Sequence, residues 1–162
     1  MANEQWPSLP YEDWKETYAT LHMWSQIVGK IRLVQMPWIN HSWHVTLYVN
    51  ARGLTTSAIP YGRRSFQIDF DFIDHSLLIR TSDSAVRTVA LRAFPVSEFY
   101  GELFGHLADL GFNVKISARP NEVAEPIPFA RDGEHATYDP EYANRWWRLL
   151  LPTARVFGDF RA

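Results

Sequence analysis

A strict alternation of polar and apolar residues runs through Ser65-Phe66-Gln67-Ile68-Asp69-Phe70-Asp71-Phe72. Successive side chains of a β-strand point to opposite faces of the sheet. One face of this strand therefore carries only large apolar side chains, whereas the other carries a serine, a glutamine and two aspartates. The alternation predicts a sheet that packs one face on a hydrophobic core and leaves the other face polar.

Shorter strands with turn signals between them surround this one. Asp74-His75 and Ser82-Asp83-Ser84 are typical turn sequences. Consecutive short strands joined by tight turns indicate an antiparallel meander. Segment 54–59 is predicted as a short strand or an extended arm. The other predicted strands are 43–49, 65–72, 77–81, 86–92 and 112–117.

Helical periodicity marks both ends of the chain and its middle. The first helix begins near Pro10 and ends before Pro37, because its apolar residues recur at helical spacing and proline interrupts helices. A second helix is predicted over about 96–110, and Gly111 follows it in the position that often ends a helix. A third helix begins at Asp139-Pro140-Glu141, where a capping residue, a proline and an acid follow one another.

These elements predict an α+β fold: an antiparallel β-meander sheet packed on one face by an N-terminal helix, a middle helix and a C-terminal helix. The 162 residues are enough for one domain over 1–162 with a packed core. Gly101 and Gly105 each cost the middle helix about 1 kcal/mol relative to alanine, and we expect close packing against the sheet to explain them. The proline-rich segment 119–138 is predicted to be an extended surface arm.

Composition excludes several classes of protein. The net charge is −2, so no strong positive field attracts nucleic acid or an anionic membrane. The chain contains no cysteine, which excludes disulfides and cysteine-ligated zinc. No apolar run approaches the ~20 residues of a membrane-spanning helix, and residues 1–7 lack the features of a signal peptide. A cytoplasmic protein with no nucleic-acid or membrane partner is therefore expected.

The chain resembles an uncharacterised bacterial family, the domain of unknown function number 5996, in motifs spread over nearly its whole length. The motifs include Trp6-Pro7-x-Leu9-Pro10-Tyr11, Asn40-His41-x-Trp43-His44-Val45, Ala51-Arg52-Gly53-Leu54-Thr55-Thr56-Ser57, Ile68-Asp69-Phe70-Asp71-Phe72 and Pro126-Ile127-Pro128-Phe129. No activity is assigned to that family, so the resemblance implies none. Its members continue past the position where this chain ends. The resemblance therefore implies either a natural short form or the N-terminal half of a two-half architecture, and a homodimer would replace the missing half.

Two histidines, His41 and His44, are candidate metal ligands. Zinc is held by three or four converging ligands, and histidine is a common one. On a strand, a spacing of three places the two side chains on opposite faces, so they share an ion only if residues 40–43 turn or bulge. We favour the alternative, in which one histidine caps the sheet and the other is hydrogen-bonded on the polar face.

Asp69 and Asp71 share the polar face of the central strand, roughly 6.5–7 Å apart from the strand rise. Carboxylates at that separation can run acid–base chemistry or, with His44, hold a hard cation. The alternative is a structural role, in which cross-strand arginines neutralise both acids. The available arginines are Arg52, Arg80 and Arg87.

Three functions remain open at this point. The first is a small-molecule-binding domain whose cleft on the polar sheet face is shielded by the arm at 119–138 and lined by Trp43, His44, Tyr48, Arg52, Asp69 and Asp71. The second is a metal-assisted or acid–base enzyme that uses the two histidines and the two aspartates. The third is a homo-oligomeric interaction module. The sequence contains no phosphate-binding loop, nucleophile elbow or dinucleotide-binding motif, so it does not identify a cofactor. As site residues, His44 and Asp69 are expected to tolerate alanine without loss of folding.

Overall fold

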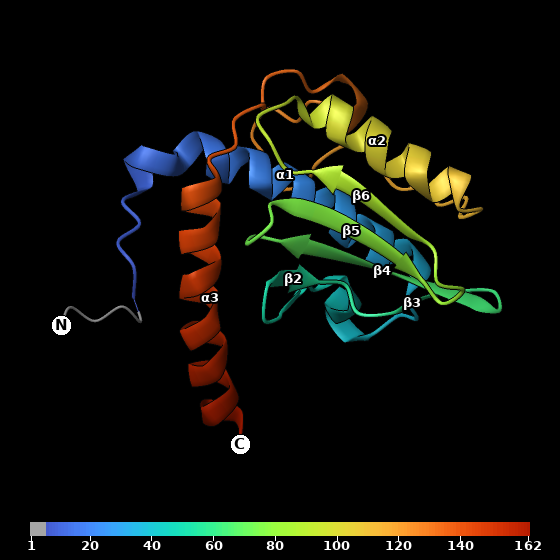
Figure 1. Ribbon diagram of the computed structural model, residues 1–162, viewed down its shortest axis with the longest axis horizontal. Coiled ribbons are helices and arrows are strands. Elements are labelled where there is room, and N and C mark those ends of the chain that lie inside the picture. Colours follow the sequence, from blue (N-terminus) through green and yellow to red (C-terminus); the bar gives the residue numbers. More distant parts are fainter. Residues whose placement is uncertain (1–5) are drawn as a thin grey trace.

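The computed structural model describes residues 6–162, which form helices at both ends of the chain and a sheet between them (Figure 1). The helices are α1 (Tyr11–Gln35), α2 (Val96–Asp109) and α3 (Pro140–Arg161), with short 3-10 helices η1 (Asn40–Val45) and η2 (Phe129–Arg131). The strands are β1 (Tyr48–Val49), β2 (Gly53–Thr55), β3 (Ile59–Tyr61), β4 (Arg64–Asp71), β5 (Ser76–Thr81) and β6 (Val86–Ala90). The α+β class and the three predicted helices are confirmed.

All strand pairs are antiparallel, in the order β1-β2-β4-β5-β6, and β3 also pairs with β4. The segment 54–59, predicted as a short strand or an extended arm, thus contributes to two short strands, β2 and β3, on the same edge of β4. Thr56 joins them: its N–H donates to the carbonyl of Ile68 at 3.0 Å, and its Oγ1 accepts from the N–H of Ile68 at 2.9 Å. The hydroxyl takes the place of a main-chain acceptor, so the chain can turn at Ser57, whose φ is 55°.

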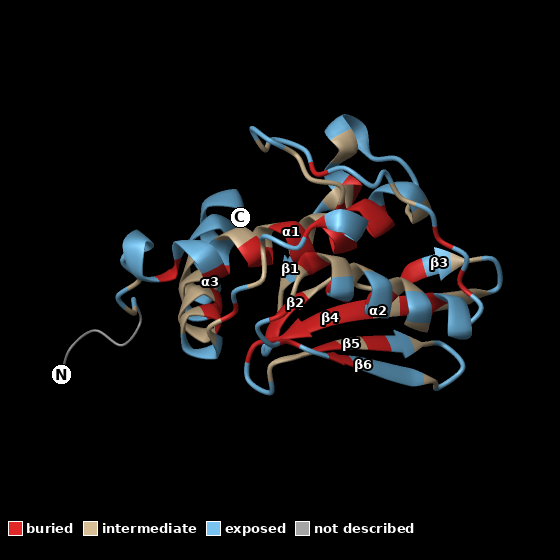
Figure 2. Ribbon diagram, turned by 90° about the horizontal axis from the view of Figure 1, so that it is seen from above, coloured by how far each residue is buried: buried red, intermediate tan, exposed pale blue. Residues whose placement is uncertain are grey.

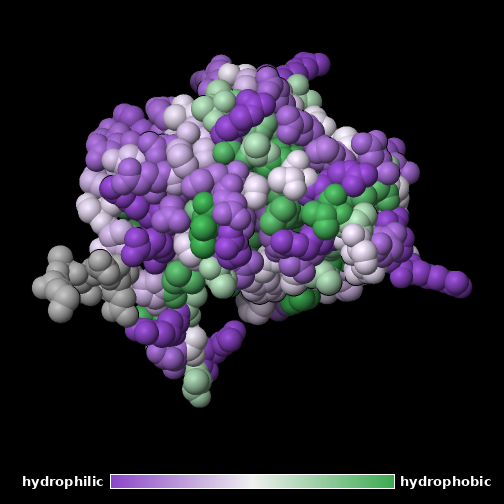
Figure 3. All heavy atoms as spheres, in the orientation of Figure 1, coloured by the Kyte–Doolittle hydropathy of each residue, from purple (hydrophilic) through white to green (hydrophobic). Residues whose placement is uncertain are grey.

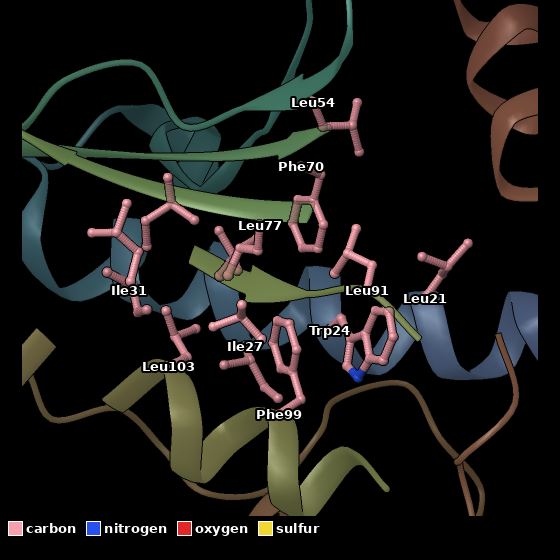
Figure 4. Packing of buried hydrophobic residues seen from close by; sticks show 14 of the residues in the cluster. Leu21, Trp24, Ile27, Ile31, Leu54, Phe70, Leu77, Leu91, Phe99 and Leu103 are labelled. Carbon is pink, nitrogen blue, oxygen red and sulfur yellow. The ribbon is translucent and has the colours of Figure 1, made fainter. Parts of the chain in front are cut away.

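The alternation in β4 determines which face of the sheet is covered. Its three large apolar side chains, and that of Phe72 directly after the strand, are at most 2% exposed, as predicted, and β4 is buried along most of its length in Figure 2. Figure 4 shows Phe70 and Leu77 of the sheet pointing toward Trp24 and Ile27 of α1 and toward α2. Trp24 stacks on Phe99 of α2 with ring centroids 4.8 Å apart. The core therefore lies between one sheet face and two helices.

The third helix packs at the end of this core, against the strands β1 and β2 and against α1. Asp139 caps it as predicted, because its side chain accepts from the N–H groups of Glu141 and Tyr142. The helix continues through Pro152 and buries only Ala143 and Trp147. Its C-terminal end projects from the body at the bottom of Figure 3.

Two strand predictions are wrong. Residues 40–45 form η1, in which His41 and Ser42 adopt φ values of 55° and 59°, and only Tyr48–Val49 remains extended. Residues 43–45 complete η1 and Thr46 is its C-cap, so the alternation at 43–49 does not become a ladder. The segment 112–117 buries alternate residues, Phe112 and Val114, but pairs with no strand of the described chain.

The arm at 119–138 is also placed differently from the prediction. It packs on the helices: the N–H of Thr137 donates to Thr20 of α1 at 3.2 Å, and the carbonyl of Asp132 accepts from the N–H of Ser97 at the start of α2. Phe129 and Asp132 are fully buried, so the arm belongs partly to the core. It does not roof the polar face of the sheet.

The packing explanation for the α2 glycines is wrong as well. A Cβ added at Gly101 or Gly105 would meet no atom within 4 Å. Both residues lie on the exposed side of the helix. Gly111, in contrast, has a φ of 83° and ends the helix as predicted.

Among residues 6–162, no helix combines the length and the hydropathy needed to cross a bilayer. Residues 1–5, which include most of the segment considered for a signal peptide, lie outside the described residues.

Candidate functional site

Three of the predicted site residues come together on the polar face of the sheet. Arg52, Asp69 and Asp71 line a depression of about 290 Å³ with Asn50, Ala51, Phe70, Leu78 and Arg80. Trp43, His44 and Tyr48 are not part of this lining. The predicted cluster is therefore divided between two regions of the molecule.

Asp71 is held by the turn that follows β4. Its Oδ1 accepts from the N–H groups of Ile73 and Asp74 at 2.9 Å, and its Oδ2 accepts from Nε of Arg52 at 2.5 Å. Burial alone would raise the pKa of this carboxyl, but the hydrogen bonds from Arg52 and the turn outweigh burial, so the pKa lies below its ordinary value. A carboxylate held in its charged form does not donate protons near neutral pH.

Asp69 has its own cationic partner. Nη1 of Arg80 donates to its Oδ2 at 2.5 Å, and Nε2 of Gln67 donates to both carboxylate oxygens at 2.9 Å. Each buried acid of the pair is thus neutralised by an arginine. The contacts match the structural alternative, in which cross-strand arginines balance the two acids.

His44 lies in η1, packed on the end of α1. Its Nδ1 accepts from the N–H of Ile39 at 3.2 Å, and its Nε2 lies 3.2 Å from the carbonyl of Leu33. The Nε2–H tautomer satisfies both contacts, so neither ring nitrogen has a free lone pair for an ion. Over residues 6–162, no three histidine or acidic side chains converge where an ion would be held.

Trp43 and Tyr48 lie near His44 in the chain but point to solvent. Trp43 is 63% exposed, and its ring is paired with that of His41 at 6.0 Å. Tyr48 lies under the guanidinium of Arg32, 5.1 Å from the ring centroid. These residues form the outer surface of η1 and β1 rather than a cleft with the two aspartates.

A larger hollow lies on the other side of η1, between α1, the strands β1 and β2, and α3. This groove has a volume of about 850 Å³. Its lining consists of His22, Ser25, Gln26, Gly29, Lys30, Leu33, Ser42, Val45, Leu47, Val49, Leu54, Asn121, Glu122, Trp146 and Leu150. It brings together segments that are far apart in the sequence.

One wall of the groove is a polar stripe on α1. His22, Gln26 and Lys30 follow one another at intervals of four, which places them on one face of the helix. Gln26 exchanges two hydrogen bonds with the main chain of Asn121, at 2.8 and 2.9 Å, and contacts Nε2 of His22 at 3.0 Å. The arm thus fixes the amide of Gln26 beside the groove.

Lys30 is the most unusual member of this stripe. Its side chain is 8% exposed, and its Nζ donates to Oδ1 of Asn121. Within residues 6–162, no carboxylate oxygen forms an ion pair with Nζ of Lys30 at 4.0 Å or less. Because burial removes water from the ammonium group, the pKa of Lys30 lies below its ordinary value.

The facing wall is apolar. It consists of Val45, Leu47, Val49 and Leu54 from the segment between η1 and β2, together with Trp146 and Leu150 of α3. Gly29 allows this segment to approach α1, because a Cβ there would already lie 3.4 Å from Val45. The groove was not predicted from the sequence. Its signal was the set of polar residues that interrupts the apolar pattern of α1 at every fourth position.

The fold and this groove define an α+β protein with a ligand-sized hollow between its first helix, its sheet edge and its last helix. The chain belongs to the family of unknown function DUF5996, whose model matches residues 6–162. This match confirms the resemblance seen in the motifs and covers nearly the whole chain, not only an N-terminal half. No curated protein and no solved structure matches it.

Proposed function

We propose that this protein binds a small organic molecule in the groove between α1, the β1–β2 edge and α3. The observation that carries the proposal is the groove itself, whose volume of about 850 Å³ falls in the usual range of ligand pockets, about 300–1,000 Å³. Ligand pockets combine apolar walls with a few convergent polar groups. The polar stripe of His22, Gln26 and Lys30 on α1 and the aliphatic wall opposite it have this arrangement.

The depression on the polar face of the sheet, lined by Arg52, Asp69 and Asp71, is a weaker candidate for a binding site. It is about one third as large, and its charged groups already satisfy one another through the Arg52–Asp71 and Arg80–Asp69 contacts. A ligand entering there would have to replace ion pairs that the protein has already formed. For the same reason, no contact at these residues favours the acid–base enzyme.

Binding of dansylamide, a neutral aromatic fluorophore, tests the proposal. The emission of this probe rises in an apolar environment, so a titration gives its dissociation constant. Ser25→Trp places an indole in the groove, because Ser25 lines it and is only partly exposed. We expect this variant to weaken binding by about ten-fold or more, the equivalent of about 1.4 kcal/mol.

Thr88→Trp is the matched control, because Thr88 is exposed on β6, away from the groove lining. We expect it to bind dansylamide as the parent protein does. A parent protein that does not bind the probe, or equal weakening by both tryptophans, would contradict the proposal.

The homodimer stays a prediction from the sequence. Its direct measurement is the molar mass in solution by light scattering over a range of protein concentrations. The exposed rings of Phe157 and Phe160 on the projecting end of α3 are the first positions to replace with serine if a dimer is found.

A further inference from the structure

Lys30 differs from an ordinary surface lysine in both burial and partners. Lys15, on the same helix, has a 46% exposed side chain and is paired with Glu12 at 2.9 Å. Lys30 is 8% exposed and has one polar contact, the amide oxygen of Asn121. An ammonium group has three N–H donors, so this contact leaves two of them without a protein acceptor within the described chain.

Burying a cation without an opposite charge is unfavourable, because the group loses its hydration and gains no ion pair. The only acidic residue that lines the groove is Glu122, which is exposed and forms no ion pair with Lys30 within 4.0 Å among residues 6–162. His22, the other titratable group of the stripe, contacts Gln26 rather than an acid. The wall of the groove thus presents a positive charge that forms no ion pair with a carboxylate of the described chain.

The remaining lining of the groove favours a ligand with a particular distribution of apolar surface. Val45, Val49, Leu54 and Leu150 offer aliphatic surface, and Trp146 offers an aromatic face. A ligand that fits both walls has an apolar body and one negatively charged end. Charge-assisted hydrogen bonds between an ammonium group and a carboxylate are about twice as strong as neutral ones, so the charged end would fix the orientation of the body.

We propose that the ligand of this groove is an amphipathic organic carboxylate whose acid group pairs with Nζ of Lys30 and whose apolar body packs on the aliphatic wall. This inference rests on the proposed binding function and adds the chemical class of the ligand. Lys30 is then a ligand-binding residue, and Asn121 is a positioning residue that holds its ammonium group at the groove.

A matched pair of probes tests the inference. Dansylglycine and dansylamide share one fluorophore, but only dansylglycine carries a carboxylate. We expect the parent protein to bind dansylglycine more tightly. Lys30→Met keeps the length of the side chain and removes its charge, and we expect it to weaken dansylglycine binding about 10- to 100-fold, as for the loss of one charged hydrogen bond. Binding of dansylamide should change little.

Two further variants make the result specific. Lys15→Met removes the same charge from the exposed part of α1 and should leave both dissociation constants unchanged. Lys30→Arg keeps the positive charge and should keep the preference for dansylglycine. Thermal unfolding of each variant shows whether the groove is still folded.

The outcomes separate this inference from the proposed function. If the parent protein binds both probes equally, or if Lys30→Met weakens both equally, the carboxylate inference is wrong and the binding function stands. If the parent protein binds neither probe, the proposed function itself is wrong. Loss of dansylglycine binding in Lys15→Met would show a general effect of charge and would also overturn the role of Lys30.

Discussion

Nε of Arg32 donates a 2.7 Å hydrogen bond to the main-chain carbonyl of His44. This contact joins the last turn of α1 to η1, and Nη1 of the same guanidinium reaches Oγ of Ser57 at 3.2 Å. Arg32 is almost completely buried. The segment that forms the apolar wall of the groove is therefore held in place by one arginine, and His44 is part of that support rather than part of a binding surface.

His44→Ala is expected to lower the free energy of unfolding by about 2 kcal/mol. The substitution removes a side chain that is 1% exposed together with its hydrogen bonds to Ile39 and Leu33, and each such bond contributes about 0.5–1.5 kcal/mol. This reverses the expectation from the sequence that alanine would be tolerated here. Urea denaturation measures the change. Trp43→Ala, at an exposed neighbour, should stay within about 0.5 kcal/mol, and equal effects of the two variants would contradict the structural role.

The Arg52–Asp71 contact predicts a dependence of stability on pH. The pKa of Asp71 is lower in the folded protein than in the unfolded chain, so the folded state is favoured whenever the carboxyl is ionised. This stabilisation is complete above the unfolded pKa of about 3.9 and disappears as the pH falls through the lower folded pKa. Asp71→Asn should therefore reduce the urea midpoint at pH 6, and the difference from the parent protein should shrink toward pH 2.

Glu125→Gln, in the exposed part of the arm, is the control for this measurement. It should follow the parent protein at every pH. A constant difference between Asp71→Asn and the parent protein over the whole range would mean that the charge of Asp71 does not stabilise the fold.

Phe70→Ala should cost about 3–5 kcal/mol, because the ring is 2% exposed and its removal leaves a cavity between the sheet and α2. Phe160→Ala provides a matched loss of a benzyl group at a position that is 91% exposed. Its effect should stay within about 0.5 kcal/mol. A similar result for the two variants, by urea denaturation at low protein concentration, would mean that the buried face of the sheet has been assigned wrongly.

Gly101→Ala and Gly105→Ala should each stabilise the protein by about 0.5–1 kcal/mol. Both positions are exposed and open, so a methyl group meets no obstacle and the unfolded chain loses conformational freedom. Gly111→Ala is the opposite case, because its φ of 83° disfavours any side chain. Calorimetric melting should show a higher Tm for the first two variants and a lower Tm for the third. A lower Tm in all three variants would contradict the open environment of Gly101 and Gly105 and would show that this face of α2 is covered in solution.

Lys30→Met should leave the free energy of unfolding of the ligand-free protein equal to, or above, that of the parent protein. The substitution removes a buried charge that has no opposite partner in residues 6–162, and such replacements are often neutral or stabilising. A binding residue is commonly kept at the expense of stability. Clear destabilisation by urea denaturation would instead show that Lys30 is a structural support.

Local features of the chain predicted most of the fold. The period of two in β4 and the cap at Asp139 depend on neighbouring residues, so they can be recognised in sequence. The alternation at 43–49 was misleading because residues 43–45 complete the 3-10 helix η1, which a period of two does not reveal. Segment 112–117 buries Phe112 and Val114 as a strand would, but a strand also needs a partner, and that depends on distant parts of the chain.

The candidate site was harder to predict for the same reason. The sequence placed His44 with Asp69 because both lie on strands in the simplest interpretation, whereas Arg32 holds His44 on α1. The groove is built from α1, the residues after η1, the arm and α3, and its lining residues lie up to 128 positions apart, from His22 to Leu150. Only the polar residues His22, Gln26 and Lys30, spaced four apart on a helix with many buried residues, indicated the groove locally.

The anchoring of α3 has a consequence for how any occupant leaves the groove. Two residues of α3 are buried, whereas α1 buries twelve. Resistance to local opening grows with buried contacts, so main-chain amides beyond Trp147 should exchange their hydrogens for deuterium well before those of α1. We therefore expect the wall formed by Trp146 and Leu150 to open first, and, under the proposed binding function, the residence time of a bound probe to follow the opening rate of that helix.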